Sequence, residues 1–193
     1  MGTDGSTERT AVDEYREEVE RQTREVSEIV AGLGEEQLAW RPEPEKWSVG
    51  EHVVHLIRTI PPYLVEFEEA LADARERGLA AAGPFRRPWL GEWVIRTMEP
   101  PPGISIPTVK TLVPDRGLPR ERIVESWRDA QDSLIASMEE ARGLDLGRAR
   151  IRSPFVPLLR VTADQGYRLV LAHARRHIWL VRRTMEAEGF PSG

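Results

Sequence analysis

The chain has 193 residues, a formal net charge of −5 and a hydrophobic fraction of 40%. This length and composition predict one globular domain that buries an adequate core without a disulfide or metal staple. The acidic balance argues against a general nucleic-acid or anionic-membrane binder, so we expect neither as a partner. The chain has no cysteine, which excludes thiolate nucleophiles, cysteine-type zinc sites, iron–sulfur clusters and disulfides.

The first ten residues are polar and lack the apolar stretch of a secretory signal. No apolar run approaches the roughly 20 residues that a membrane span requires. We therefore expect a cytoplasmic protein with a single domain over residues 1–193 and a core from about residue 7 to residue 188.

The first two long helices are predicted from their apolar periodicity and their caps. One runs from about residue 7 to residue 33, and the second from Ser48 to about Arg77. Ser48 begins a capping box that Glu51 completes. Pro61-Pro62 lies inside the second pattern, so a kink or a brief break is expected there. In the first helix, apolar residues recur every seven residues, at Val12, Val19, Val26 and Leu33.

Residues 80–118 contain seven prolines, so only one short helix fits, at about residues 87–98. Trp89 and Trp93 lie one turn apart on it. A connection this long often covers a functional site, and the two indoles would then roof a pocket. The alternatives are a proline-stiffened crossover that only spans one end of the domain, and indoles that are buried in its core.

A third helix is predicted over about residues 119–143, and a fourth begins at a second capping box formed by Thr162 and Gln165 and ends before Gly189. No segment predicts a convincing sheet. Four helices of about 20 residues or more, with one long proline-rich crossover between the second and third, indicate an all-α four-helix bundle.

All four histidines of the chain fall on two of these helices. His173 and His177 are four residues apart, so both can bind one metal ion from one helix face. A third imidazole from His52 or His55 would complete a three-histidine site with an open position, as in catalytic zinc sites. Helical periodicity alone favours His52, because it lies nearer the apolar stripe. A histidine pair at this spacing is often only hydrogen-bonded, but the second pair on another helix favours a metal.

The segment from Lys46 to Leu56, KWSVGEHVVHL, resembles the W-S-x-x-E-x-x-x-H-L signature of the DinB-like superfamily. Residues 172–178, AHARRHI, resemble the H-x-x-x-H motif of its fourth helix. The resemblance extends over about residues 10–188. It implies an up-down-down-up four-helix bundle that holds a divalent metal, commonly zinc or nickel, through three histidines at one end.

Position by position, the resemblance assigns the metal ligands to His55, His173 and His177, and we follow it for His55. His52 remains the alternative ligand or a neighbour that supports the ligands. Many members of the superfamily have a glutamine three residues after the last histidine, where this chain has Leu180. Leu180 cannot make the polar contact to a ligand residue or to the substrate that a glutamine would offer.

Three neutral imidazoles leave a metal its full double charge, which acidifies a bound water or thiol. The resemblance implies an S-transferase that uses a low-molecular-weight thiol, bacillithiol or mycothiol, on a small-molecule substrate. The alternatives are a metal-dependent hydrolase and a non-catalytic, stress-linked metal-binding protein. An open metal position facing a concave pocket favours an enzyme, and a sealed site favours the non-catalytic protein.

Trp89, Trp93 and Arg176 are the candidate residues of a substrate pocket. Arg175 and Arg176 separate the two histidines of the fourth helix, and an arginine can bind a carboxylate or sulfonate in bidentate fashion. Pairing with the acidic first helix is the simpler explanation for such arginines. A homodimer is also expected, because dimers are common among similar proteins.

Overall fold

The computed structural model is predominantly helical, with six α-helices, one 3-10 helix and two short strands among the residues that it describes. The start of the first predicted helix, residues 7–9, lies outside them. The described residues are 10–81, 83–103, 108–114, 117–156 and 158–192.

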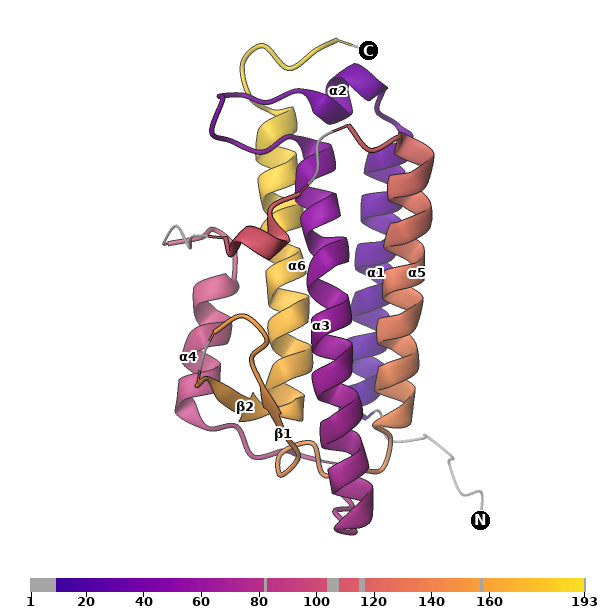
Figure 1. The fold of residues 1–193 in the computed structure, drawn as a ribbon, viewed down its shortest axis with the longest axis vertical. Coiled ribbons are helices and arrows are strands. Elements are labelled where there is room, and N and C mark those ends of the chain that lie inside the picture. Colours follow the sequence, from indigo (N-terminus) through magenta and orange to yellow (C-terminus); the bar gives the residue numbers. More distant parts are fainter. Residues whose placement is uncertain (1–9, 82, 104–107, 115–116, 157, 193) are drawn as a thin grey trace, which may run out of the picture.

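Four long helices lie side by side along the molecule (Figure 1). They are α1 (Ala11–Ala31), α3 (Val49–Glu76), α5 (Arg120–Glu140) and α6 (Ala163–Met185). Helices α3 and α5 begin at the end where α2 (Glu35–Ala39) lies and run to the other end, whereas α1 and α6 run in the opposite direction. Their facing sides form one apolar core, in which the largest fully buried side chains are Trp127, Tyr167 and Phe67.

Three of the long helices begin at reciprocal caps, and two of these confirm the sequence prediction. The side chains of Ser48 and Thr162 accept hydrogen bonds from the backbone N–H groups of Glu51 and Gln165. The side chains of Glu51 and Gln165 accept bonds from the backbone of the cap residues in return. Each pair satisfies N–H groups that have no partner within the helix, so the starts of α3 and α6 are fixed locally.

The sequence predicted a kink or a brief break at Pro61-Pro62, and the break is wrong, because α3 continues through both prolines. Pro61 is exposed, so water can reach the region where a backbone hydrogen bond is lost. On the inner side, Ile60 and Tyr63 are buried on either side of the pair and hold the helix against the core.

Two short elements were not predicted from the sequence. Helix α2 lies between the first two predicted helices, and a two-stranded antiparallel hairpin precedes α6. Strand β1 (Arg150–Arg152) pairs with β2 (Arg160–Thr162), with Ile151 opposite Val161. These two side chains are buried, so the hairpin closes one end of the core.

The crossover contains helix α4 (Trp89–Met98) and the 3-10 helix η1 (Lys110–Leu112), so the predicted short helix is confirmed. Helix α4 packs against α6. Gln165 donates a hydrogen bond to the Pro88 carbonyl over 2.7 Å, and Arg168 forms an ion pair with Glu92 at 2.6 Å. These contacts attach the crossover to the side of α6.

Among the described residues, no helix combines the length and the apolar character needed to cross a bilayer.

Gly91 of α4 lies against the Gln165 side chain of α6, and replacing it tests how the crossover is attached. A Cβ atom at this position would lie 2.3 Å from the side-chain oxygen of Gln165, which is buried and holds the cap of α6. We expect Gly91→Ala to lower the free energy of unfolding by about 1–3 kcal/mol through overpacking. Gly103→Ala is the control, because its new Cβ would meet no described atom beyond its chain neighbours within 4 Å. Equal urea midpoints for both variants would contradict this packing.

Candidate metal centre

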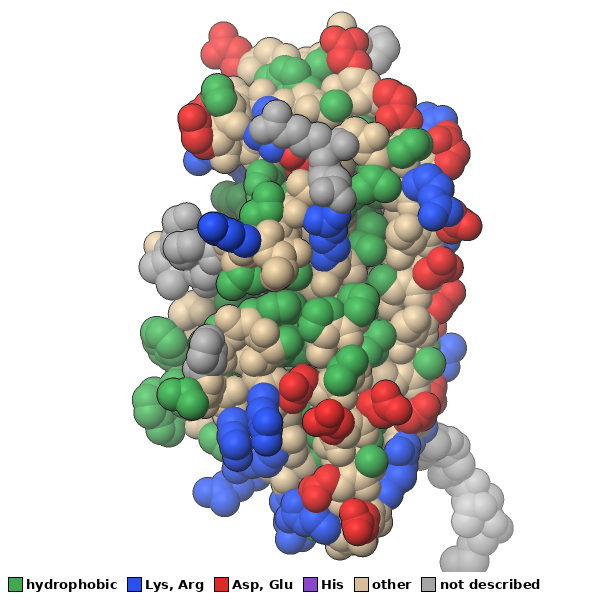
Figure 2. Space-filling view, viewed as in Figure 1, with side chains coloured by type: hydrophobic (Ala, Val, Ile, Leu, Met, Phe, Trp, Pro, Cys, Tyr) green, Lys and Arg blue, Asp and Glu red, His purple; other side chains and the backbone are tan. Residues whose placement is uncertain are grey.

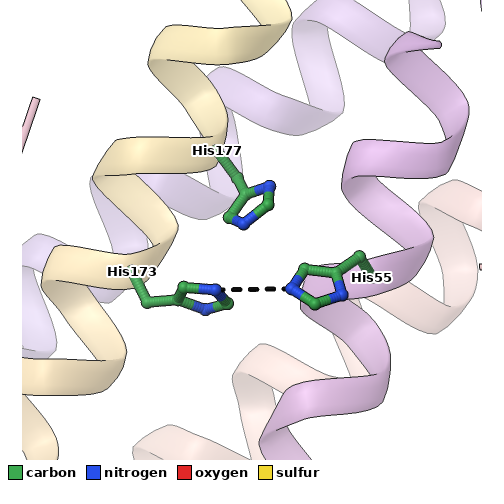
Figure 3. A group of neighbouring side chains, drawn as sticks. All are labelled: His55, His173 and His177. Carbon is green, nitrogen blue, oxygen red and sulfur yellow. Dashed lines mark hydrogen bonds between the residues drawn. The ribbon is translucent and has the colours of Figure 1, made fainter. Parts of the chain in front are cut away.

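Three histidines from two helices converge on one point. His55 comes from α3, and His173 and His177 come from α6. One ring nitrogen of each lies within 4.8 Å of the others, and their rings turn toward a common space (Figure 3). The Nε2 atoms of His55 and His173 are 3.3 Å apart. Two nitrogens bound to one tetrahedral zinc at about 2.05 Å would also lie about 3.3 Å apart, so these donors fit a single ion.

The nitrogens on the far sides of two of these rings have partners of their own. His55 Nδ1 lies 2.9 Å from the carbonyl oxygen of Leu112. A carbonyl only accepts, so His55 carries its proton on Nδ1 and its Nε2 lone pair faces the other histidines. Such an outer hydrogen bond fixes the tautomer and the ring orientation of a metal-binding histidine.

His52 lies against His177 and is not part of the group of three. The Nδ1 atoms of the two rings are 3.0 Å apart, so one donates to the other. With the proton on Nδ1 of His177, the Nε2 lone pair of that ring is available for a metal. The structure therefore gives His52 the contact of a supporting neighbour, and brings His55 to the group.

Burial keeps all four imidazoles neutral. It lowers the pKa of His52 and of His173 to about 3, and it lowers the pKa of His55 and of His177 as well. Loss of hydration penalises the imidazolium, and the neighbouring rings and arginines add repulsion. Neutral imidazole is the form that binds a metal, so the centre is ready for an ion at neutral pH.

Trp47 covers three of the four rings. Its ring centroid lies 4.8 Å from that of His55, 5.4 Å from that of His52 and 6.0 Å from that of His177. From the sequence, Trp47 was identified only as part of a motif. The signal for its contact is the cap at Ser48, because the residue before a helix cap packs against the fourth helical residue, here His52.

An ion pair fixes the segment that carries Trp47. Arg41 Nε donates to Glu51 over 2.7 Å, and a second guanidinium nitrogen contacts the other carboxylate oxygen. Arg41 also donates to the carbonyl of Pro44 over 2.7 Å. Glu51 is buried and accepts from the Ser48 backbone, so one carboxylate ties the start of α3 to the loop above the histidines.

A cavity of about 960 Å³ opens beside the histidines, and all four of them line it. Further walls come from helix α4, from the segment around η1 and from the segment before β2. Their lining residues are Val94, Met98, Thr108, Val109, Leu112, Val113, Ser153, Phe155, Val156 and Leu159. Arg176, one of the candidate pocket residues, lines the cavity. Arg175 instead pairs with Glu18 of α1 at 3.1 Å and with Glu99, which matches the simpler explanation given for such arginines.

The two tryptophans proposed for the pocket lie elsewhere. Trp89 is 77% exposed and Trp93 is 55% exposed, and neither is among the residues that line the cavity. Hydrophobic side chains are visible on the surface over α4 (Figure 2). It is the other side of α4, with Val94 and Met98, that faces the cavity.

A family model described as the DinB superfamily matches residues 18–181. The chain belongs to the DinB superfamily. The match includes all four histidines, both segments that carry the resemblance, and the whole crossover. No curated protein and no solved structure matches the chain.

The buried neutral histidines predict a pH-dependent stability of the metal-free protein. Unfolded histidines take up protons below about pH 6.5, whereas folded His52 and His173 stay neutral down to about pH 3. The free energy of unfolding therefore falls between these values as the pH decreases, by about 1.4 kcal/mol per pH unit for each such histidine. Urea unfolding in chelator at several pH values measures the slope.

His52→Gln is the matched variant for this measurement. It removes one of the buried imidazoles, so its slope should be shallower by about 1.4 kcal/mol per pH unit. A slope equal to that of the unsubstituted protein would mean that His52 is not buried in the neutral form.

Proposed function

We propose that His55, His173 and His177 bind one divalent metal ion, zinc or nickel, and that the protein is a metal-dependent enzyme. We also propose that its four long helices form the up-down-down-up four-helix bundle that the resemblance implies. The three-histidine group in the structure and the superfamily match support this proposal.

The observation that carries the proposal is a group of three protein ligands on the wall of a large cavity. Within the described residues, no fourth histidine, aspartate or glutamate joins the group. Structural zinc sites use four protein ligands, whereas catalytic sites use three and leave a position for substrate or water. This arrangement favours an enzyme over the non-catalytic alternative.

We propose the reaction to be the transfer of a low-molecular-weight thiol, bacillithiol or mycothiol, to a small electrophile. A bound metal would supply the acidity that converts the thiol to a thiolate. The chain contains no cysteine, so the sulfur has to come from the cosubstrate. A reduced thiol of this kind is kept in the cytoplasm, and we propose that location for the protein.

The cavity supports a reaction of two organic molecules. Its volume of about 960 Å³ lies near the upper end of the roughly 300–1,000 Å³ that is typical of ligand pockets. It therefore has room for a thiol and an acceptor together, whereas hydrolysis needs room for one substrate and water. Trp47 and Leu112 shield the histidines on two sides, and His52 orients His177.

Metal analysis of the purified protein tests the centre. The unsubstituted protein should bind one zinc or nickel ion per chain, and His55→Ala and His177→Ala should each lose most of it, because two imidazoles remain. His52→Phe should keep the stoichiometry but weaken binding by about 10- to 100-fold, since it removes only an outer hydrogen bond. Full metal content in both alanine variants would refute these ligands.

A thiol-conjugation assay tests the reaction. The metal-loaded protein should consume bacillithiol or mycothiol together with an electrophile such as monochlorobimane, and chelator should abolish the rate. His55→Ala should lower the rate by at least about 100-fold, because the thiolate is no longer stabilised. Metal-dependent cleavage of ester substrates without thiol, and no conjugation, would replace the transferase by the hydrolase.

A further inference from the structure

Arg176 is a buried cation in the wall of the cavity. Its residue is 8% exposed, and it lines the cavity together with the histidines. One guanidinium nitrogen donates to the carbonyl of Thr97 over 3.1 Å, so the side chain reaches from α6 to the end of α4. Burial lowers the pKa of Arg176, and a guanidinium in such a place is stabilised when an anion approaches it.

The rest of the wall combines apolar surface with few acids. Among the described residues of the wall, the acids are Glu43 and Glu45, which are exposed in the loop before Trp47 beside the exposed Lys46. Arg183 also lines the cavity, but it is exposed and pairs with Glu186. The apolar wall includes Tyr63, Val94, Met98, Phe155, Leu159 and Leu169. A ligand with an apolar body and one negative group matches this surface.

Arg176 also lies close to the histidine group. It directly precedes His177 on α6, and it lines the same cavity as the three histidines. An anion held by this guanidinium would therefore place the attached body beside the three histidines.

We propose that the substrate is an amphipathic oxyanion, an apolar or aromatic body with a carboxylate or sulfonate that binds Arg176. The proposal adds a substrate class to the proposed function, and it rests on that function for the reaction that the substrate undergoes. The charged head selects and orients the substrate, and the apolar wall binds its body. In this proposal, the guanidinium of Arg176 binds the charged group of the substrate directly and so determines which substrates are accepted.

Two fluorescent probes with one aromatic body test the proposal. They are 8-anilinonaphthalene-1-sulfonate and its uncharged counterpart, N-phenyl-1-naphthylamine. A sulfonate is a poor metal ligand, so its binding reports on the guanidinium, and titrations are run with and without metal. We expect the full-length protein to bind the anionic probe more tightly than the neutral probe by about 10- to 100-fold in both states.

Substitutions then assign the preference to Arg176. Arg176→Met keeps the length of the side chain without its charge, and should weaken the anionic probe by about 10-fold or more while the neutral probe stays within about 2-fold. Arg176→Lys should retain part of the preference. Arg183→Met is the matched control at the exposed arginine of the same wall, and both probes should bind it as they bind the unsubstituted protein.

Three results would overturn the proposal. They are equal binding of the two probes by the unsubstituted protein, equal weakening of both probes in Arg176→Met, and a preference that Arg183→Met removes. The first needs no variant, so it holds even if Arg176→Met does not fold. Metal content is measured on the same samples. A protein that binds no metal but keeps the anion preference would refute the proposed function and leave the oxyanion site standing.

Discussion

The centre depends on the exclusion of water from four imidazoles between α3 and α6, of which three are buried and His173 is half-buried. Loss of hydration makes the imidazolium unfavourable, and the lowered pKa of each ring shows this cost. A metal ion would differ from a proton here, because one ion could bind the lone pairs of three rings at once. The same burial that disfavours protonation would leave these lone pairs free of competing protons.

Glu51 contributes both to the start of helix α3 and to the position of the loop above the histidines. Its carboxylate caps the start of α3 through the Ser48 backbone and pairs with Arg41 in the preceding loop. That loop ends at Trp47, which lies over His55 and His52. A capping box is a local feature of the sequence, yet here its glutamate also holds the loop that places Trp47 over the histidines. This explains why a helix-start signature and a histidine lie at a set spacing in one motif.

The sequence predicted what depends on local spacing and missed what depends on distant contacts. The caps and the pair His173 and His177 follow from neighbours in the chain. Periodicity favoured His52 over His55, but residues three apart on a helix differ by only about 60° in direction. Both rings are buried, and the contact of Leu112 with His55, from a distant loop, decides which nitrogen faces the group. The short hairpin before α6 was likewise missed. Each of its strands has only three residues, too few to show an alternating pattern in the sequence.

The crossover does more than span one end of the helices. Its backbone holds His55 through Leu112, and its helix α4 supplies Val94 and Met98 to the cavity and the Thr97 carbonyl to Arg176. Four packed helices alone would leave this side of α3 and α6 in water, where a histidine keeps an ordinary pKa near 6.5 and an arginine stays hydrated. Prolines restrict the backbone of such a segment and lower the entropy lost when it is ordered. The proline-rich crossover is thus the element that adds the outer wall of the cavity beside the two histidine-bearing helices.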